Sequence, residues 1–312
     1  MGTFYLRDFN QMDKADKNRI QLMIVGAQKS GTSSLLRYLA QHPDIYTHPQ
    51  PEMTYFLQDH EYDSGYDSAY AKYFSKCPDG KSIIAKNVMV MCSTERMQRI
   101  YEHNPEMNLV VLLREPVSRA YSAYWWARRR GWENIKSFED ALDAEESRHN
   151  EDWFKWRQCL YKFNSTYYPH INNLISMFGE EQVHCFLTDA LTTGANSICQ
   201  QIYAIMGVNS EFEPTVGKKF NQAAMPRSDK FGYLFTQFLA SRNPLRRAIR
   251  KLVPDSAAYK FRKAILDINE KPFIPPQINP NTSMELSKHF NPYNEELSEL
   301  LKQDLIHWQN LN

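Results

Sequence analysis

Two glycines at 26 and 31 frame the first segment of the chain whose residue types could carry out chemistry. The segment VGAQKSGTSSLL, residues 25–36, has the glycine spacing of nucleotide phosphate-binding loops. Thr32 follows the second glycine, where the common loop has a lysine, and the lysine of this segment is Lys29. Backbone N–H groups, hydroxyls and the N-terminus of a following helix together bind anions. The segment therefore predicts an anion site in which Lys29 supplies positive charge.

A second candidate anion site follows the apolar run NLVVLLREP, residues 108–116, which ends in Arg114, Glu115 and Pro116. Nucleotide enzymes that depend on magnesium place an aspartate at the end of such a strand to hold the metal. An arginine there favours an anion instead, because a guanidinium can bind phosphate through two parallel N–H donors. Ser122 lies about two helical turns further along and can add a hydroxyl. The two segments favour a phosphorylated ligand without a metal.

The elements that must position these residues are apolar strands alternating with helices. The sequence predicts strands over 21–27, 81–90, 108–116 and 182–191, and helices from 32, over 117–131, over 194–208 and over 291–308. This alternation predicts an α/β fold with a central parallel sheet flanked by helices and a P-loop-type loop after the first strand. Ligands of such sheets bind at the carboxyl ends of the strands, where both candidate segments fall.

Composition limits the class of protein. With 312 residues, 42% hydrophobic, and a net charge of +1, the chain is expected to form a single globular domain over 1–312. Its predicted parts are an N-terminal extension over 1–20, a less regular lid region over 213–290 and a C-terminal helix over 291–312. The amphipathic segment 243–252 is interpreted as a solvated helix, with a substrate-steering helix or a membrane-surface helix as the alternatives.

Charge and residue spacing also exclude several partners. The balanced charge argues against nucleic acid, and no apolar run reaches the roughly 18 residues of a membrane span, so we expect a cytoplasmic protein without stable membrane association. Scattered cysteines and histidines predict no bound metal. The sequence leaves the oligomeric state open.

Taken together, VGAQKSGTSSL and LVVLLREPVSRAYSAYWW resemble the two cofactor signatures of the sulfotransferases that use 3′-phosphoadenosine 5′-phosphosulfate (PAPS). In that family the first loop surrounds the 5′-phosphosulfate, and an Arg-Asp/Glu-Pro turn with a later serine binds the 3′-phosphate. The resemblance implies PAPS as donor, 3′-phosphoadenosine 5′-phosphate (PAP) as product, and no metal. It assigns the 5′-phosphosulfate to Gln28, Lys29, Ser30, Gly31, Thr32, Ser33 and Ser34, the 3′-phosphate to Arg114 and Ser122, and a weaker cofactor contact to Arg227.

The catalytic base is expected near the segment HPDIYTHPQPEMTYFLQ, residues 42–58. It is similar to the segment of the heparan-sulfate-like branch in which a strand end carries a glutamate followed by aromatics, and Glu52 takes that position. His48 is the alternative base, because the ordinary histidine pKa suits neutral pH. That branch often has a lysine before the glutamate, whereas this chain has Pro51. Lys86 matches a strand-borne lysine of the family and is expected to be either a site cation or the partner of Glu52.

Aromatic and basic residues nearby have two interpretations each. Four aromatic residues are predicted as walls of an acceptor site, with a place in the core as the alternative: Tyr55, Phe56, Trp125 and Tyr167. The basic run at 128–130 could line a polyanion groove, but a solvated helix end is favoured.

The resemblance implies transfer of a sulfuryl group from PAPS to a hydroxyl or to an amine or amide nitrogen of an acceptor. We expect a small molecule of specialised metabolism, with Glu52 as base and Lys29 stabilising the leaving phosphate. A polysaccharide of the glycosaminoglycan type is the alternative acceptor. The alternative functions are a nucleotide kinase with a degenerate loop and a non-catalytic nucleotide-binding protein.

Overall fold

The computed structural model describes residues 18–217, 224–226 and 270–308. The chain forms two compact units: unit 1 is Met1–Arg114 with Pro169–Lys218, and unit 2 is Glu115–Tyr168 with Lys219–Asn312. The predicted cofactor residue Arg227 and the predicted helix over 243–252 lie outside the described residues. The organisation as one domain over 1–312 stays a prediction.

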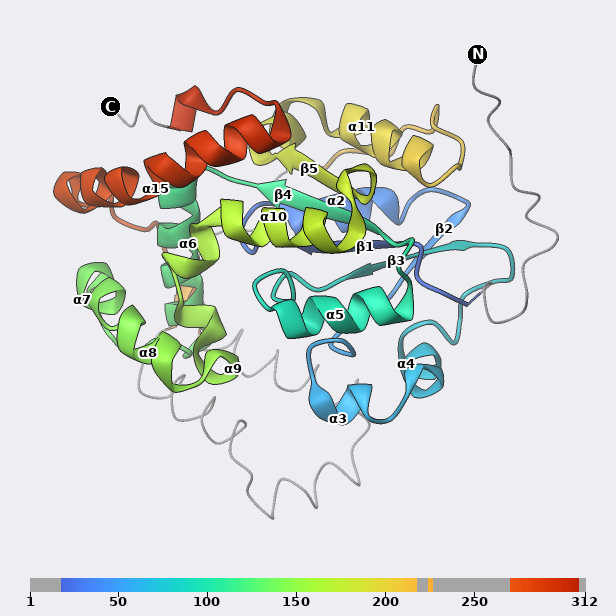
Figure 1. The fold of residues 1–312 in the computed structure, drawn as a ribbon, viewed down its shortest axis with the longest axis horizontal. Helices are drawn as coiled ribbons and strands as arrows, with labels where there is room; N and C mark the ends of the chain where they lie inside the picture. Colours follow the sequence, from blue (N-terminus) through green and yellow to red (C-terminus); the bar gives the residue numbers. More distant parts are fainter. Residues whose placement is uncertain (1–17, 218–223, 227–269, 309–312) are drawn as a thin grey trace. The chain divides into compact units, whose positions relative to one another are not determined.

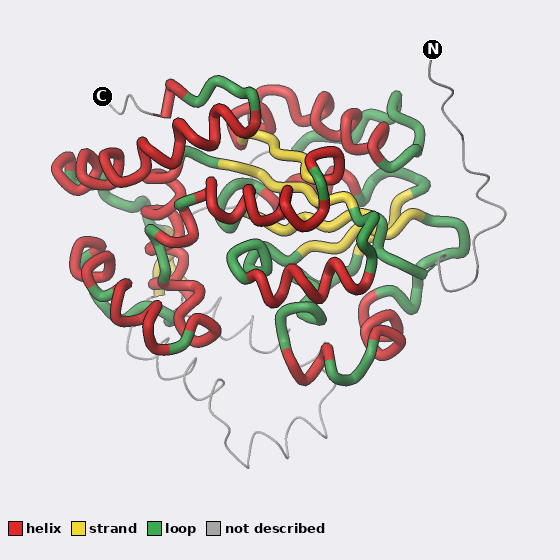
Figure 2. Tube along the Cα trace, viewed as in Figure 1, coloured by secondary structure: helices red, strands yellow, loops and turns green. Residues whose placement is uncertain are grey.

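Unit 1 is built on a five-stranded parallel sheet with the strand order β2-β3-β1-β4-β5 (Figure 1; Figure 2). The strands are β1 (Leu22–Gly26), β2 (Ile45–Thr47), β3 (Ser82–Lys86), β4 (Asn108–Leu113) and β5 (Val183–Leu187). The helices are α2 (Thr32–Leu39), α3 (Asp59–Tyr62), α4 (Tyr66–Tyr73), α5 (Thr94–His103), α10 (Tyr167–Phe178) and α11 (Thr188–Ile205). The predicted α/β fold with a parallel sheet is confirmed.

Strand β1 lies at the point where the strand order reverses. From β1 the chain builds β2 and β3 on one side of it and then β4 and β5 on the other. Ile24 on β1 is in register with Lys86 on β3 and with Val110 on β4. Because all strands are parallel, the segments that follow β1, β3 and β4 emerge at the same edge, which is the usual ligand site of open α/β sheets.

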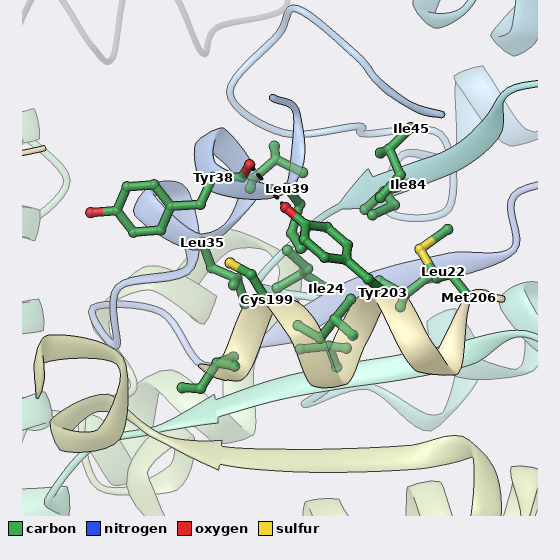
Figure 3. Close-up of a cluster of buried hydrophobic side chains, with 14 of the residues drawn as sticks. Leu22, Ile24, Leu35, Tyr38, Leu39, Ile45, Ile84, Cys199, Tyr203 and Met206 are labelled. Carbon is green, nitrogen blue, oxygen red and sulfur yellow. Dashed lines mark hydrogen bonds between the residues drawn. The ribbon is translucent and has the colours of Figure 1, made fainter. Parts of the chain in front are cut away.

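Both faces of this sheet are buried, which explains why its strands read as continuous apolar runs. Leu22 and Ile24 of β1 belong to a core cluster with residues of α2 and α11, and Figure 3 shows this cluster packed around Leu35, Cys199 and Tyr203. Figure 1 shows α5 and α10 on the opposite face of the sheet. Successive side chains of β1 point to opposite faces of the sheet, so the strand packs against helices on both faces.

Several predicted boundaries are corrected by local hydrogen bonds. The strand predicted over 81–90 ends at Lys86, because the Asn87 side chain accepts from the Met89 N–H (3.0 Å) and donates to the Met53 carbonyl (2.9 Å), which turns the chain. The strand predicted to 191 ends at Leu187, and α11 begins at Thr188 rather than at 194. The short strand β2 and the helices α3, α4 and α5 were not predicted.

Unit 2 contains the helix that follows Arg114. Its elements are α6 (Pro116–Arg130), α7 (Phe138–Asp143), α8 (Glu145–Glu151), α9 (Trp153–Trp156), α15 (Pro280–Leu301) and an antiparallel pair of strands, β6 (Ala224–Pro226) and β7 (Glu270–Pro272). The Glu115 carboxylate caps α6 by accepting from the Val117 and Ser118 N–H groups at 2.7 and 2.6 Å. Gly131, with a φ of 66°, ends α6 as predicted.

The last long helix also differs from its prediction. It begins at Pro280 rather than at 291 and ends at Leu301, so the end of the region predicted as less regular is helical. Asn279 caps it by accepting from the Asn281 N–H at 2.9 Å, and Pro280 occupies the first turn, where proline is favourable. Within the described ranges, none of the helices combines the length and hydrophobicity that a transmembrane segment needs.

Candidate active site

The loop between β1 and α2 has the backbone shape that its glycines predict. Lys29 and Gly31 both have left-handed φ angles, 73° and 92°. At Gly26 the constraint is space, because a Cβ added there would lie 2.5 Å from the Met91 sulfur. A larger residue at 26 would displace the Met91 side chain, whereas one at 31 would strain the left-handed backbone of the turn.

Polar groups without intrahelical partners gather where this loop enters α2. The N-cap residue Gly31 supplies no side-chain cap, and the first N–H groups of any helix lack acceptors within the helix. The Ser30 hydroxyl is fully buried and has no hydrogen-bond partner among the described residues. Buried polar atoms normally have partners, so an unpaired one beside a helix N-terminus fits a bound anion.

Arg114 joins the two predicted anion motifs. It follows β4 directly, is half-buried, and donates a hydrogen bond from Nη1 to the Lys29 carbonyl at 3.3 Å. The arginine of the second motif and the lysine of the first are thus in contact within unit 1. Ser122 lies half-buried on α6 in unit 2, and its pairing with Arg114 stays a prediction from the motif.

Glu52 and Lys86 form an ion pair at the end of β3. Glu52 Oε2 also accepts from the Val88 N–H at 3.2 Å, and the Met53 N–H donates to the Lys86 carbonyl at 2.8 Å. Glu52 itself lies in the loop after β2 and not at a strand end, so these bonds hold its carboxylate in place. Lys86 is 1% exposed while Glu52 is only half-buried, so the carboxylate is the accessible member of the pair.

The pKa of the Glu52 carboxyl reflects two opposing effects. Desolvation by the surrounding protein raises this pKa above its usual value. The Lys86 ammonium and the Val88 N–H lower it, and the net direction is upward. A carboxylate with a raised pKa and a fixed orientation is suited to accept a proton.

His48 is built into the structure in a way that does not suit a general base. Its Nδ1 donates to the Gln50 carbonyl at 2.8 Å, and its Nε2 accepts from the Lys86 N–H at 3.0 Å. Burial lowers the pKa of His48 to about 4, so the ring is neutral at pH 7. Since backbone groups occupy both nitrogens, the ring connects the Glu52 loop to β3, and this geometry favours Glu52 over His48 as the base.

Three of the four predicted wall residues belong to the interior. Tyr55 and Phe56 are 5% and 0% exposed, and Tyr55 packs edge-on to Phe56 in an aromatic cluster that includes Tyr62. Tyr167 is 1% exposed. This burial favours the alternative expectation, a place in the core, for these three residues. Trp125 is half-buried and packs against Phe273 in unit 2.

The basic run at the end of α6 is more structured than a solvated helix end. Arg128 is buried and donates to the Ile135 carbonyl at 2.6 Å, where it helps to close the turn after α6. The guanidinium groups of Arg129 and Arg130 lie over the Trp126 ring, 5.4 and 4.4 Å from its centre. The interpretation of all three as solvated is therefore wrong for Arg128.

Two side chains that no spacing pattern singled out also contact the site. Asn87 fixes the Met53 carbonyl next to Glu52, and Thr188 contacts the carbonyl of Ser30 in the phosphate loop at 3.0 Å. Asparagine and threonine are common in loops and at helix ends, so only the folded chain distinguishes these two. In the part of the chain that the structure describes, no group of three or more acidic, histidine or cysteine side chains is arranged to hold a metal.

Comparison with curated proteins finds sulfotransferases. Human heparan sulfate glucosamine 3-O-sulfotransferase 6 is 34% identical over 107 residues, which are 33% of this chain and 29% of that protein. Human heparan sulfate glucosamine 3-O-sulfotransferase 5 is 23% identical over 282 residues, 89% of this chain and 71% of that protein. The chain thus spans less than a third of the length of the first of these relatives. No protein-family model matches the chain.

Comparison with solved structures identifies the fold. A sulfotransferase from Alicyclobacillus acidocaldarius superposes with a TM-score of 0.66 over 94% of this chain and 99% of that protein, at 24% identity. The similarity therefore extends well beyond the two motifs and covers the sheet that presents them.

Proposed function

We propose that this chain, a relative of the PAPS-dependent sulfotransferases, transfers a sulfuryl group from PAPS to a hydroxyl or nitrogen of an acceptor. The observation that carries this proposal is the hydrogen bond from Arg114 Nη1 to the Lys29 carbonyl, which brings the two predicted cofactor motifs together. The buried Ser30 hydroxyl and the uncapped start of α2 support an anionic ligand at the same loop.

The donor side would be held by the residues that the motifs name. Backbone N–H groups at the start of α2, with the hydroxyls of Thr32, Ser33 and Ser34, would bind the 5′-phosphosulfate. Lys29 would stabilise the negative charge that develops on the oxygen between sulfur and phosphorus. Arg114 and Ser122 would bind the 3′-phosphate. Arg227 would make a further contact with the cofactor, an assignment that rests only on the sequence motif.

The acceptor side would depend on Glu52. In the transfer, the acceptor oxygen or nitrogen forms a bond to sulfur as the bond from sulfur to the phosphate oxygen breaks. The acceptor proton would move to the Glu52 carboxylate, and the electron pair would remain on the phosphate of PAP. Lys86 and the Val88 N–H would orient the carboxylate for this proton transfer, since both already bond to its oxygens.

Nucleotide preference tests the donor side. PAP is expected to raise the midpoint of thermal unfolding far more than AMP, or than ATP with magnesium, because Arg114 and Ser122 select a 3′-phosphate. A ligand at a hundred times its dissociation constant adds about 2.7 kcal/mol of stability, which is readily measured. Arg114→Ala should remove most of the preference for PAP over AMP.

The control is Arg99→Ala on α5, which removes the same charge from a side chain bonded to Asp59 and Glu95. This variant should keep the preference for PAP. Equal stabilisation by magnesium and ATP would support the kinase alternative, and PAP binding without any transfer would support a non-catalytic nucleotide-binding protein.

The acceptor is proposed to be a small hydroxyl- or amine-bearing molecule, because the chain's net charge of +1 gives no general attraction for a polyanion. A glycosaminoglycan is the second candidate, favoured by the substrates in the names of the curated relatives. Incubation with radiolabelled PAPS, heparan-type chains, simple phenols and a metabolite extract separates them. We expect label in small acceptors, whereas salt-sensitive transfer to the polysaccharide alone would contradict this proposal.

A further inference from the structure

The first residue of α11 contacts both candidate anion segments at once. Thr188 Oγ1 lies 3.0 Å from the Ser30 carbonyl oxygen and 3.0 Å from the Leu113 carbonyl oxygen, so the hydroxyl can donate to either. Ser30 belongs to the phosphate loop, and Leu113 immediately precedes Arg114. Neither Glu52 nor its partners take part in this contact.

The position of this hydroxyl is set by the sheet. Leu187, the preceding residue, pairs with Leu113 in the register of β5 with β4, so the backbone at Thr188 is fixed relative to the end of β4. One turn further along α11, Leu191 Cδ2 lies 3.0 Å from the place where a Cβ on Gly31 would be. The first turn of α11 therefore contacts two consecutive loop residues, Ser30 and Gly31.

The Thr188 hydroxyl is directed at carbonyl groups outside its own helix. Thr188 is the first helical residue, and the N-cap before it is Leu187, which provides no side-chain cap. In a trans peptide the carbonyl and the following N–H point in opposite directions. A hydrogen bond to the Ser30 carbonyl therefore holds the Gly31 N–H facing away from Thr188, and a contact with the Leu113 carbonyl restrains the Arg114 N–H in the same manner.

We propose that Thr188 is a positioning residue for the nucleotide: its hydroxyl couples the phosphate loop to the start of the Arg114 motif and so preorganises both for one ligand. This inference rests on the proposed function, because it presumes that the two motifs bind PAPS and PAP. It assigns Thr188 no contact with the nucleotide. The loss of its hydroxyl should weaken nucleotide binding while the fold persists.

The test measures PAP affinity by titration calorimetry in the full chain. Thr188→Val keeps the shape of the side chain and removes the donor, so the dissociation constant of PAP should rise about tenfold. Thr188→Ser retains the hydroxyl and should stay within about twofold of the wild-type value. Amide hydrogen exchange over residues 26–36 without ligand should be faster in T188V and normal in T188S, while exchange in α5 stays normal in both variants. A general loss of stability would speed exchange in α5 as well.

Thr192 supplies the matched control. It lies on the same helix, and its hydroxyl bonds only to the Thr188 carbonyl, at 3.0 Å, among the hydrogen bonds of the described residues. Thr192→Val should therefore leave PAP affinity unchanged. If T188V does not fold, T188A is measured in its place, because it removes the same hydroxyl.

The outcomes are distinguishable. A wild-type protein that does not bind PAP overturns the proposed function, and this inference with it. A wild type that binds PAP together with a T188V variant of equal affinity overturns the role of Thr188 alone. Failure of serine to restore affinity, or an equal loss in T192V, would also overturn it, because the hydroxyl at 188 would then not be the cause.

Discussion

Replacement of Lys29 by alanine is expected to lower kcat by about a hundredfold or more while PAP still binds. The ammonium is the positive charge that the loop itself carries, and in the transfer its effect grows as negative charge develops on the leaving phosphate. The backbone of the loop is held independently, by the Arg114 contact with the Lys29 carbonyl and by Thr188 at Ser30. The variant should therefore lose transition-state stabilisation more than ground-state binding.

The measurement is initial rate against PAPS concentration, together with the dissociation constant of PAP. Lys29→Arg keeps the charge and should retain more activity than the alanine variant. Lys76→Ala removes an exposed lysine between α4 and β3 and should leave both kcat and the dissociation constant of PAP unchanged. A Lys29→Ala enzyme with normal kcat would remove Lys29 from the chemistry.

Glu52→Gln is expected to reduce kcat by about a hundredfold or more for an alcohol acceptor, because an amide cannot accept the proton. The amide oxygen of glutamine can still accept from Lys86, so the loop after β2 should keep its position. PAP affinity should change little, since the donor site is formed by other residues. Loss of PAP binding in parallel with kcat would instead indicate a structural role for this carboxylate.

His48→Gln distinguishes the two bases considered for this reaction. Both nitrogens of His48 bond to backbone groups, and glutamine can accept from the Lys86 N–H without being able to act as a base. Its activity should remain far above that of Glu52→Gln. The reverse order of the two variants would return the role of base to His48.

The pH dependence of kcat/KM gives an independent check on Glu52. A general base must be deprotonated, so activity falls as the pH drops through the pKa of the free enzyme. Because desolvation raises the pKa of Glu52, the acidic limb should lie above the ordinary pKa of a glutamate. The Glu52→Gln variant should lack this limb in its residual activity.

The sequence alone determined the class of fold and the identity of the central loop. Apolar runs that alternate with amphipathic helices specify a parallel sheet covered on both faces, because only that arrangement buries both sides of each strand. The spacing of Gly26 and Gly31 and the cation at Lys29 are local properties, and they predicted an anion site without reference to distant residues. The same holds for the end of α6, where Gly131 supplies the left-handed residue that closes the helix.

The tertiary structure decided which polar residues lie together and which are buried in backbone contacts. Strand order is set by long-range pairing, and the pairing of β2 with β3 brings the loop that carries Glu52 beside Lys86. His48 is a candidate base in the sequence, but in the fold it is buried and both of its nitrogens bond to backbone groups. Thr188 belongs to no sequence motif. Its hydroxyl meets the carbonyl groups of Ser30 and Leu113 only because β5 pairs with β4 in the folded chain. Sequence patterns record the periodicity of local elements, whereas such contacts depend on register and burial, which arise only when the elements pack.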